Sequence, residues 1–92
     1  MRDRPDWTFL SNHAHVIVCL ALEPDSRIRD MADRVGVTER TVTGIIADLE
    51  DAGILSIEKV GRRNRYRINR RARLRHPLEE HKTVGDLLRA IS

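Results

Sequence analysis

The spacing of apolar residues changes once along this 92-residue chain, and that change limits the folds available to it. Between residues 27 and 52 the apolar side chains recur every three or four positions, as on one face of a helix. After Gly53 they alternate with polar side chains, as in strands that bury one face. The sequence therefore predicts a mainly α-helical domain with a small β-hairpin.

Two consecutive helices with a tight connection are predicted in the middle of the chain. The first of them spans about residues 27–35, with Ser26 as its N-terminal cap and Gly36 at its C-terminal end. The second spans about residues 38–52 and is capped by Thr38. Their apolar faces consist of Ile28, Met31, Ala32 and Val35 in one helix, and of Val42, Ile45, Ile46 and Leu49 in the other.

A further helix is predicted on each side of this pair. Residues 11–22 are apolar around much of the circumference, Leu22 included, and Pro24 ends that helix. A C-terminal helix is predicted from Leu78 and is best defined over Val84, Leu87, Leu88 and Ile91. The expected organisation is an N-terminal arm over residues 1–10, a domain over residues 11–69, and a linker with a C-terminal helix over residues 70–92.

The hairpin and the segment after it are predicted to carry most of the positive charge. The tip of the hairpin is expected at residues 61–65, with Gly61 and Asn64 as turn residues. Residues 1–57 carry six basic and ten acidic side chains, whereas residues 58–75 carry nine basic and one acidic. A focused cationic patch attracts a polyanion more strongly than a diffuse excess does. This distribution favours a nucleic-acid partner, although a solvated basic run is the alternative.

The composition also narrows the function classes. The single cysteine, Cys19, permits no internal disulfide and fits a reducing compartment. No run approaches the roughly 18 apolar residues of a membrane span, and the first residues lack the apolar core of a secretion signal. We therefore expect a cytoplasmic protein. No phosphate loop, metal-spaced cluster or nucleophile–base set is recognisable, so neither an enzyme, a cofactor nor a metal site is predicted.

In this order the elements resemble the winged helix–turn–helix transcriptional regulators of the MarR and ArsR types, including short actinobacterial-type members. The resemblance rests on residues 28–42, 48–55 and 61–66. It implies a three-helix core with a wing and a C-terminal helix, and a homodimer on a pseudo-palindromic site in double-stranded DNA. The helix at about residues 38–52 would enter the major groove, and the wing at residues 61–65 would contact the minor groove or backbone. Many relatives carry a long polar residue where this chain has Gly44.

The predicted DNA-binding residues lie on two elements. Arg40 is the main candidate for reading bases, since its guanidinium can pair with guanine O6 and N7. Glu39 is expected either to accept from cytosine or to favour the positive end of the helix. The other candidates are Thr38, Thr41, Thr43 and Gly44 in the helix, and Arg62, Arg63, Asn64, Arg65 and Arg67 in the wing.

Dimerisation is predicted through the two apolar ends of the chain. The residues concerned are Trp7, Phe9, Leu10, Val84, Leu87, Leu88 and Ile91, which exceed what a three-helix core needs. The alternative is that the last helix covers the first helix of its own chain. No small-molecule effector is indicated.

Three other interpretations remain open. Winged helices also serve as protein-interaction modules, and an antitoxin-like module without its own operator is a related possibility. The arginines of the wing argue for DNA, because a docking wing does not need them. His15 and Cys19 lie four residues apart on one helix and would form a metal or redox sensor, although a buried structural thiol is commoner.

Overall fold

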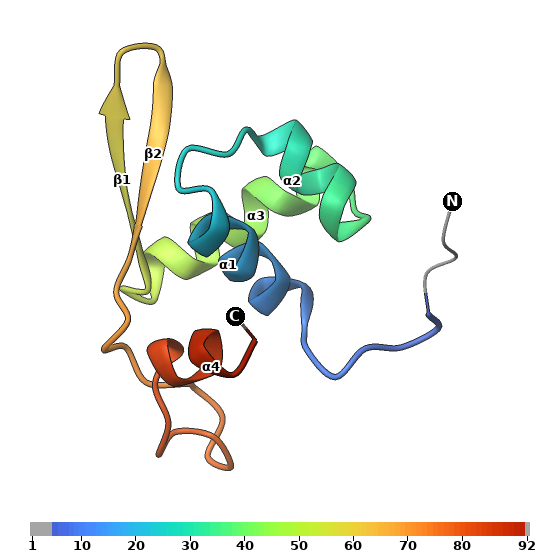
Figure 1. The fold of residues 1–92 in the computed structure, drawn as a ribbon, viewed down its shortest axis with the longest axis vertical. Coiled ribbons are helices and arrows are strands. Elements are labelled where there is room, and N and C mark those ends of the chain that lie inside the picture. Colours follow the sequence, from blue (N-terminus) through green and yellow to red (C-terminus); the bar gives the residue numbers. More distant parts are fainter. Residues whose placement is uncertain (1–4, 92) are drawn as a thin grey trace.

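A computed structural model describes residues 5–91 of the chain; residues 1–4 of the predicted arm and residue 92 lie outside the described part. Three helices lead into a two-stranded antiparallel hairpin, and a fourth helix follows (Figure 1). The elements are α1 (Asn12–Leu22), α2 (Ile28–Val35), α3 (Glu39–Asp51), β1 (Leu55–Val60), β2 (Arg63–Ile68) and α4 (Val84–Ile91). The predicted class, mainly α-helical with a wing-like hairpin, is confirmed.

Side-chain caps fix the starts of α1 and α3, and the cap of α3 is the predicted one. The hydroxyl of Ser11 accepts a hydrogen bond from the backbone N–H of Ala14 at 3.3 Å. The hydroxyl of Thr38 accepts from the backbone N–H of Thr41 at 3.0 Å. Each bond satisfies one of the N–H groups that the first turn of a helix leaves without a partner. Gly36 ends α2 with a left-handed backbone, φ 88°, as its predicted position requires.

The prediction that Ser26 caps α2 is wrong. Its hydroxyl donates to the carbonyl oxygen of Glu23 at 2.7 Å, and its backbone N–H donates to the same oxygen at 3.1 Å. The turn at Pro24 brings this carbonyl close, so Ser26 is buried in the connection between the helices. Arg27 takes the N-cap position instead, without a side-chain cap.

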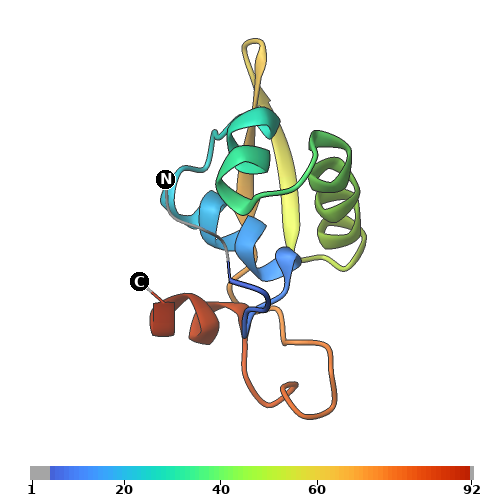
Figure 2. The ribbon, with the colours of Figure 1, turned by 90° about the vertical axis from the view of Figure 1, so that its right-hand side faces the viewer.

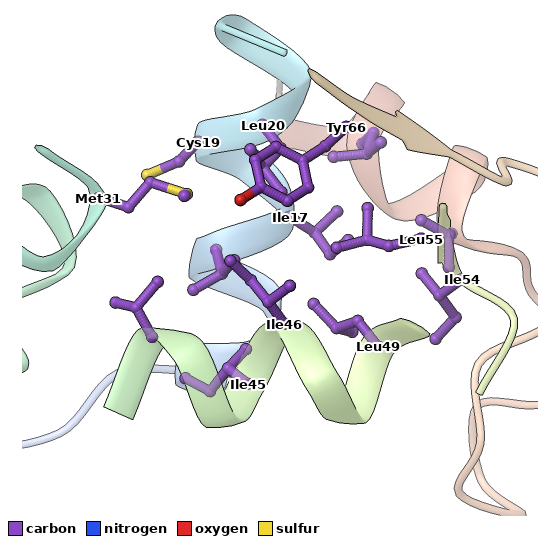
Figure 3. Packing of buried hydrophobic residues seen from close by; sticks show 14 of the residues in the cluster. Ile17, Cys19, Leu20, Met31, Ile45, Ile46, Leu49, Ile54, Leu55 and Tyr66 are labelled. Atoms are coloured by element: carbon purple, nitrogen blue, oxygen red, sulfur yellow. The ribbon is translucent and has the colours of Figure 1, made fainter. Parts of the chain in front are cut away.

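The core is built around α1, which contacts α2, α3, α4 and β2 (Figure 3). The large side chains with the least exposure are Val16, Leu20, Met31 and Val42. All four residues of the predicted α3 stripe are buried, and the opposite side of α3 is consequently free to face outward. Leu22, predicted within the apolar circumference of α1, is instead exposed at the end of that helix.

The hairpin is anchored at its base and projects beyond the helices at its tip (Figures 1 and 2). Leu55 and Tyr66 are buried on one face, and the backbone N–H of Tyr66 donates to the carbonyl of Pro24 at 2.8 Å. The turn is shorter than predicted, because only Gly61 and Arg62 lie between the strands. Asn64 is therefore not a turn residue; it lies in β2 opposite Lys59.

The last helix starts later than predicted. Leu78 is 83% exposed and lies in a turn-rich segment, whereas α4 begins at Val84. An antiparallel backbone contact explains the difference: the N–H of Leu74 donates to the Lys82 carbonyl at 2.9 Å, and that of Val84 donates to the Ala72 carbonyl at 2.8 Å. Extended backbone there cannot continue a helix from residue 78.

The start of α4 is secured by a reciprocal capping box. The backbone N–H of Thr83 donates to the carboxylate of Asp86 at 2.9 Å, and the backbone N–H of Asp86 donates to the Thr83 hydroxyl at 3.1 Å. The hydrogen bonds from Thr83 lower the pKa of Asp86 below its usual value. The contact with Thr83 therefore favours the ionised carboxylate.

Gly85 lies where the main chain of α4 meets the segment after the hairpin. Its N–H donates to the carbonyl of Arg70 at 2.9 Å, and an added Cβ would stand 3.0 Å from that oxygen and 3.2 Å from the Arg70 Cβ. The Cβ therefore has no room unless the two backbones separate.

We expect Gly85→Ala to destabilise the fold by about 1–3 kcal/mol, the usual cost of overpacking a tight contact. Denaturant unfolding followed by circular dichroism measures the change. The matched control is Gly44→Ala, because a Cβ at Gly44 meets nothing within 4 Å. Equal or greater stability of Gly85→Ala would show that α4 does not depend on this close approach.

Candidate nucleic-acid interface

The side of α3 that faces away from the core is exposed. Glu39, Arg40, Thr43, Gly44 and Ala47 are all exposed on it. Among the residues that the structure describes, none lies within ion-pair distance of Arg40. Gly44 leaves this side without a side chain at the middle of the helix, and a Cβ placed there would meet no atom within 4 Å. The first half of α3 thus offers an accessible cation beside bare backbone.

The three threonines predicted to bind DNA are not equivalent. Thr38 caps the helix and also donates its hydroxyl hydrogen to the Thr41 hydroxyl at 2.9 Å. Thr43 donates to the backbone carbonyl of Glu39 at 3.0 Å, so its hydroxyl hydrogen is already used. Thr41 only accepts in this arrangement and keeps its own hydrogen for an external acceptor. Of the three, Thr41 is the one that can still donate to a phosphate.

The cationic side chains of the hairpin are divided between its two faces. Side chains alternate along each strand, and residues paired across the strands share a face. The pairs Leu55–Ile68, Ile57–Tyr66 and Lys59–Asn64 therefore share the face that packs on the helices, while Arg63, Arg65 and Arg67 line the other. Arg65 and Arg67 therefore lie on the same side of β2. Arg62 lies at the turn itself.

Two of the predicted wing arginines already have partners within the chain. The guanidinium of Arg63 donates to the backbone carbonyl of Asp25 at 2.8 Å, which ties β2 to the α1–α2 connection. Arg67 lies 4.0 Å from the carboxylate of Glu58. Within residues 5–91, Arg62 and Arg65 have no acidic side chain at ion-pair distance. These two are the most available cations of the hairpin.

Two features were missed at the level of sequence. Lys59, which was not among the predicted DNA-binding residues, is exposed near the tip on the same hairpin face as Asn64. Its alternation with Leu55 and Ile57 in the sequence could have indicated this face. His13 and Asp48 lie 2.9 Å apart at the surface between α1 and α3. A contact across 35 positions leaves no periodic trace in the sequence.

The residues predicted to form a dimer interface occupy three different environments. Val84 and Leu88 are buried in the core of their own chain, where α4 packs on α1, so they are removed from the predicted interface. Trp7 and Phe9 are exposed on the arm, and Ile91 is partly exposed. Leu10 and Leu87 line a groove described below.

His15 and Cys19 lie on one side of α1, beside Trp7 and Arg34 at a surface hollow. Cys19 is buried, and its burial raises the pKa of the thiol above the ordinary value. A raised pKa keeps the thiol protonated and less reactive at neutral pH. In the described part of the chain, no three histidine, cysteine or acidic side chains are grouped closely enough to hold a metal ion. A sensor role for this pair remains a prediction.

The match to a known protein family agrees with the helices and hairpin described above. No helix among the described residues has the length and apolar character needed to cross a membrane. Comparison with curated proteins finds no match for the chain. Residues 13–76 match the family described as the Crp-like helix-turn-helix domain. This region includes α1 from its second residue, all of α2, α3 and the hairpin, and all the predicted DNA-binding residues. The chain therefore belongs to the Crp-like helix-turn-helix family.

Proposed function

We propose that this protein is a sequence-specific regulator that binds double-stranded DNA, with α3 in the major groove and the hairpin tip on the adjacent minor groove or backbone. The observation that carries the proposal is the exposed side of α3, where Arg40 and Gly44 lie opposite a fully buried apolar stripe. A major groove about 12 Å wide admits a helix of this kind, and a free guanidinium there can read guanine.

The hairpin supports the same proposal through its charge. Its tip projects beyond the helices and carries Arg62, with Lys59 and Arg65 exposed nearby (Figure 1). Contacts from such side chains to phosphates add affinity for any sequence, whereas contacts to base edges add discrimination. In this proposal α3 provides sequence discrimination, and the hairpin adds affinity by contacting the DNA backbone.

A homodimer on a pseudo-palindromic site completes the proposal, since one copy offers only one recognition helix. Within the helix-turn-helix class we propose a regulator of the MarR or ArsR kind that acts in the cytoplasm. The proposal needs neither a cofactor nor a catalytic step. The alternative, a protein-interaction or antitoxin-like module, leaves the exposed cations of the hairpin without a use.

Replacing Arg40 by alanine is expected to lower sequence discrimination by about 1–3 kcal/mol, because one guanidinium–base contact is lost. The measurement is the ratio of dissociation constants for the preferred fragment and for random duplex. Arg71→Ala is the matched control: it removes an equal, exposed charge outside α3 and the hairpin, and the ratio should stay the same. An unchanged ratio for Arg40→Ala would remove Arg40 from base recognition.

A salt-titrated binding isotherm tests the function itself, with random duplex DNA and the DNA upstream of the protein's own gene as probes. We expect salt-dependent binding to both, with a slope of about 0.9 per phosphate contact, and tighter binding to the upstream fragment. Binding without preference would indicate an architectural role or an operator elsewhere. Absence of binding at low salt would contradict the proposal and favour the docking module.

A further inference from the structure

An apolar groove opens beside the base of the N-terminal arm. Its apolar lining comes from Leu10, Ile17, Leu49, Ile54, Leu74 and Leu87, so α1, α3, the segment after the hairpin and α4 all contribute. The groove measures about 560 Å³. A volume of this order accommodates large side chains from outside the domain. We call it the α1–α4 groove.

The arm carries two aromatic side chains that are largely exposed. Phe9 is 93% exposed and Trp7 is 69% exposed, and their rings meet edge to face with centroids 5.1 Å apart. Phe9 touches the rim of the α1–α4 groove, yet its exposure shows that it does not fill the groove of its own chain. Figure 1 shows the arm running outward from the start of α1. The chain thus presents an unfilled apolar groove beside an uncovered aromatic pair.

We propose that the arm of one copy inserts Trp7 and Phe9 into the α1–α4 groove of a second copy, and that the exchange is reciprocal. The inference rests on the homodimer in the proposed function and specifies its interface. Reciprocal exchange is the arrangement that a two-fold axis requires, since each copy then gives and receives the same contact. The arm is rooted at the groove, because Leu10 and Ser11 line it, so an axis near this root places each arm beside the partner's groove.

The exchanged aromatic side chains would supply a large part of the buried area that a stable dimer needs. A buried tryptophan or phenylalanine covers roughly 150–250 Å². The four side chains alone would therefore bury roughly 600–1,000 Å², about half of the roughly 1,600 Å² of a standard specific interface, and the groove surfaces that they meet add to it. Arms that merely stacked on one another at the axis would leave both grooves open.

Complementation between two variants tests the exchange. The double variant Trp7→Ala/Phe9→Ala removes the aromatic pair, and Ala52→Trp blocks the groove from an exposed position on its lining. Each variant alone should raise the dimer dissociation constant at least 100-fold in sedimentation equilibrium. A one-to-one mixture should dimerise at least tenfold more tightly than either variant alone, because one intact arm then meets one intact groove.

Leu22→Ala is the control, since it removes an exposed apolar side chain that does not line the groove, and it should leave the dissociation constant unchanged. A second measurement does not depend on blocking the groove: a chain with Phe9→Cys, mixed with one carrying Ala52→Cys, should form the mixed disulfide under mild oxidation. A monomeric wild-type protein, an arm variant that dimerises like the wild type, or a mixture without recovery would each overturn the exchange. DNA binding by the wild-type protein is measured separately, so that loss of the exchange and loss of the proposed function are distinguishable.

Discussion

Gly44→Glu is expected to weaken DNA binding at least 100-fold while the domain stays folded. A side chain at this position enters open space, so the core and the helix ends are not disturbed. In the proposed complex the DNA major groove occupies this space. A glutamate carboxylate there would face the DNA phosphates and displace contacts to the bases. Like charges in an interface cost several kcal/mol, and a 100-fold loss corresponds to about 2.7 kcal/mol. The isotherm with the upstream fragment measures this loss.

Gly44→Ala separates the backbone effect from the charge effect. It should raise stability by about 1 kcal/mol, because alanine favours a helix more than glycine does. The corresponding rise in the melting temperature is about 4–8 °C for a domain of this size. If Gly44→Glu melts like Gly44→Ala and binds DNA like the wild type, α3 does not enter the groove by this side.

Tyr66→Ala is expected to cost about 3–5 kcal/mol of unfolding free energy, the usual loss for a buried aromatic side chain. Tyr66 is buried under the hairpin among Leu20, Ile17 and Leu55 (Figure 3). Total stabilities are commonly about 5–15 kcal/mol, so this single change would remove much of the margin. Because a two-stranded hairpin is marginal by itself, the wing should also lose its fixed orientation.

Ile57→Ala is the natural comparison for Tyr66→Ala. Ile57 pairs with Tyr66 across the hairpin but is partly exposed, so its loss should cost far less. Chemical denaturation gives both free energies, and amide hydrogen exchange over β1 and β2 reports the hairpin directly. Similar costs for the two variants would mean that Tyr66 does not anchor the hairpin.

The helix positions were predictable because their signals are local. The stripe of Val42, Ile45 and Leu49 fixes which side of α3 is buried, and Thr38 marks where that helix starts. By exclusion, the same stripe also predicts that the side carrying Arg40 and Gly44 is exposed. Here one periodic pattern determines both the packing and the candidate site.

Two of the wrong predictions arise because a segment found a different hydrogen-bond partner from the one expected. Ser26 directly precedes the helix predicted at about residues 27–35 and was therefore predicted to cap it. In the structure the chain turns, and the Ser26 hydroxyl donates to the Glu23 carbonyl instead. The segment after Pro77 has helical spacing, but backbone pairing between residues 72–74 and 82–84 prevents a helix there. Both outcomes depend on tertiary contacts, which a local pattern does not contain.

The site was predictable by residue type and less by orientation. Arg62, Arg63, Arg65 and Arg67 are all on the hairpin, as expected. Their separate surroundings follow from a two-residue turn and from the bond between Arg63 and Asp25, neither of which was predicted. Because Asn64 was assigned to the turn, its place in β2 and its pairing with Lys59 were not predicted.

Two contacts between β2 and the α1–α2 connection help to fix the orientation of the hairpin. Tyr66 binds the Pro24 carbonyl through its backbone, and Arg63 binds the Asp25 carbonyl through its side chain, so residues 24 and 25 hold the hairpin at two heights. The angle between the hairpin and α3 therefore depends in part on a segment that belongs to neither element. Lengthening this connection by a residue would tilt the hairpin relative to α3 and change the spacing at which the two meet DNA, with every contacting side chain unaltered.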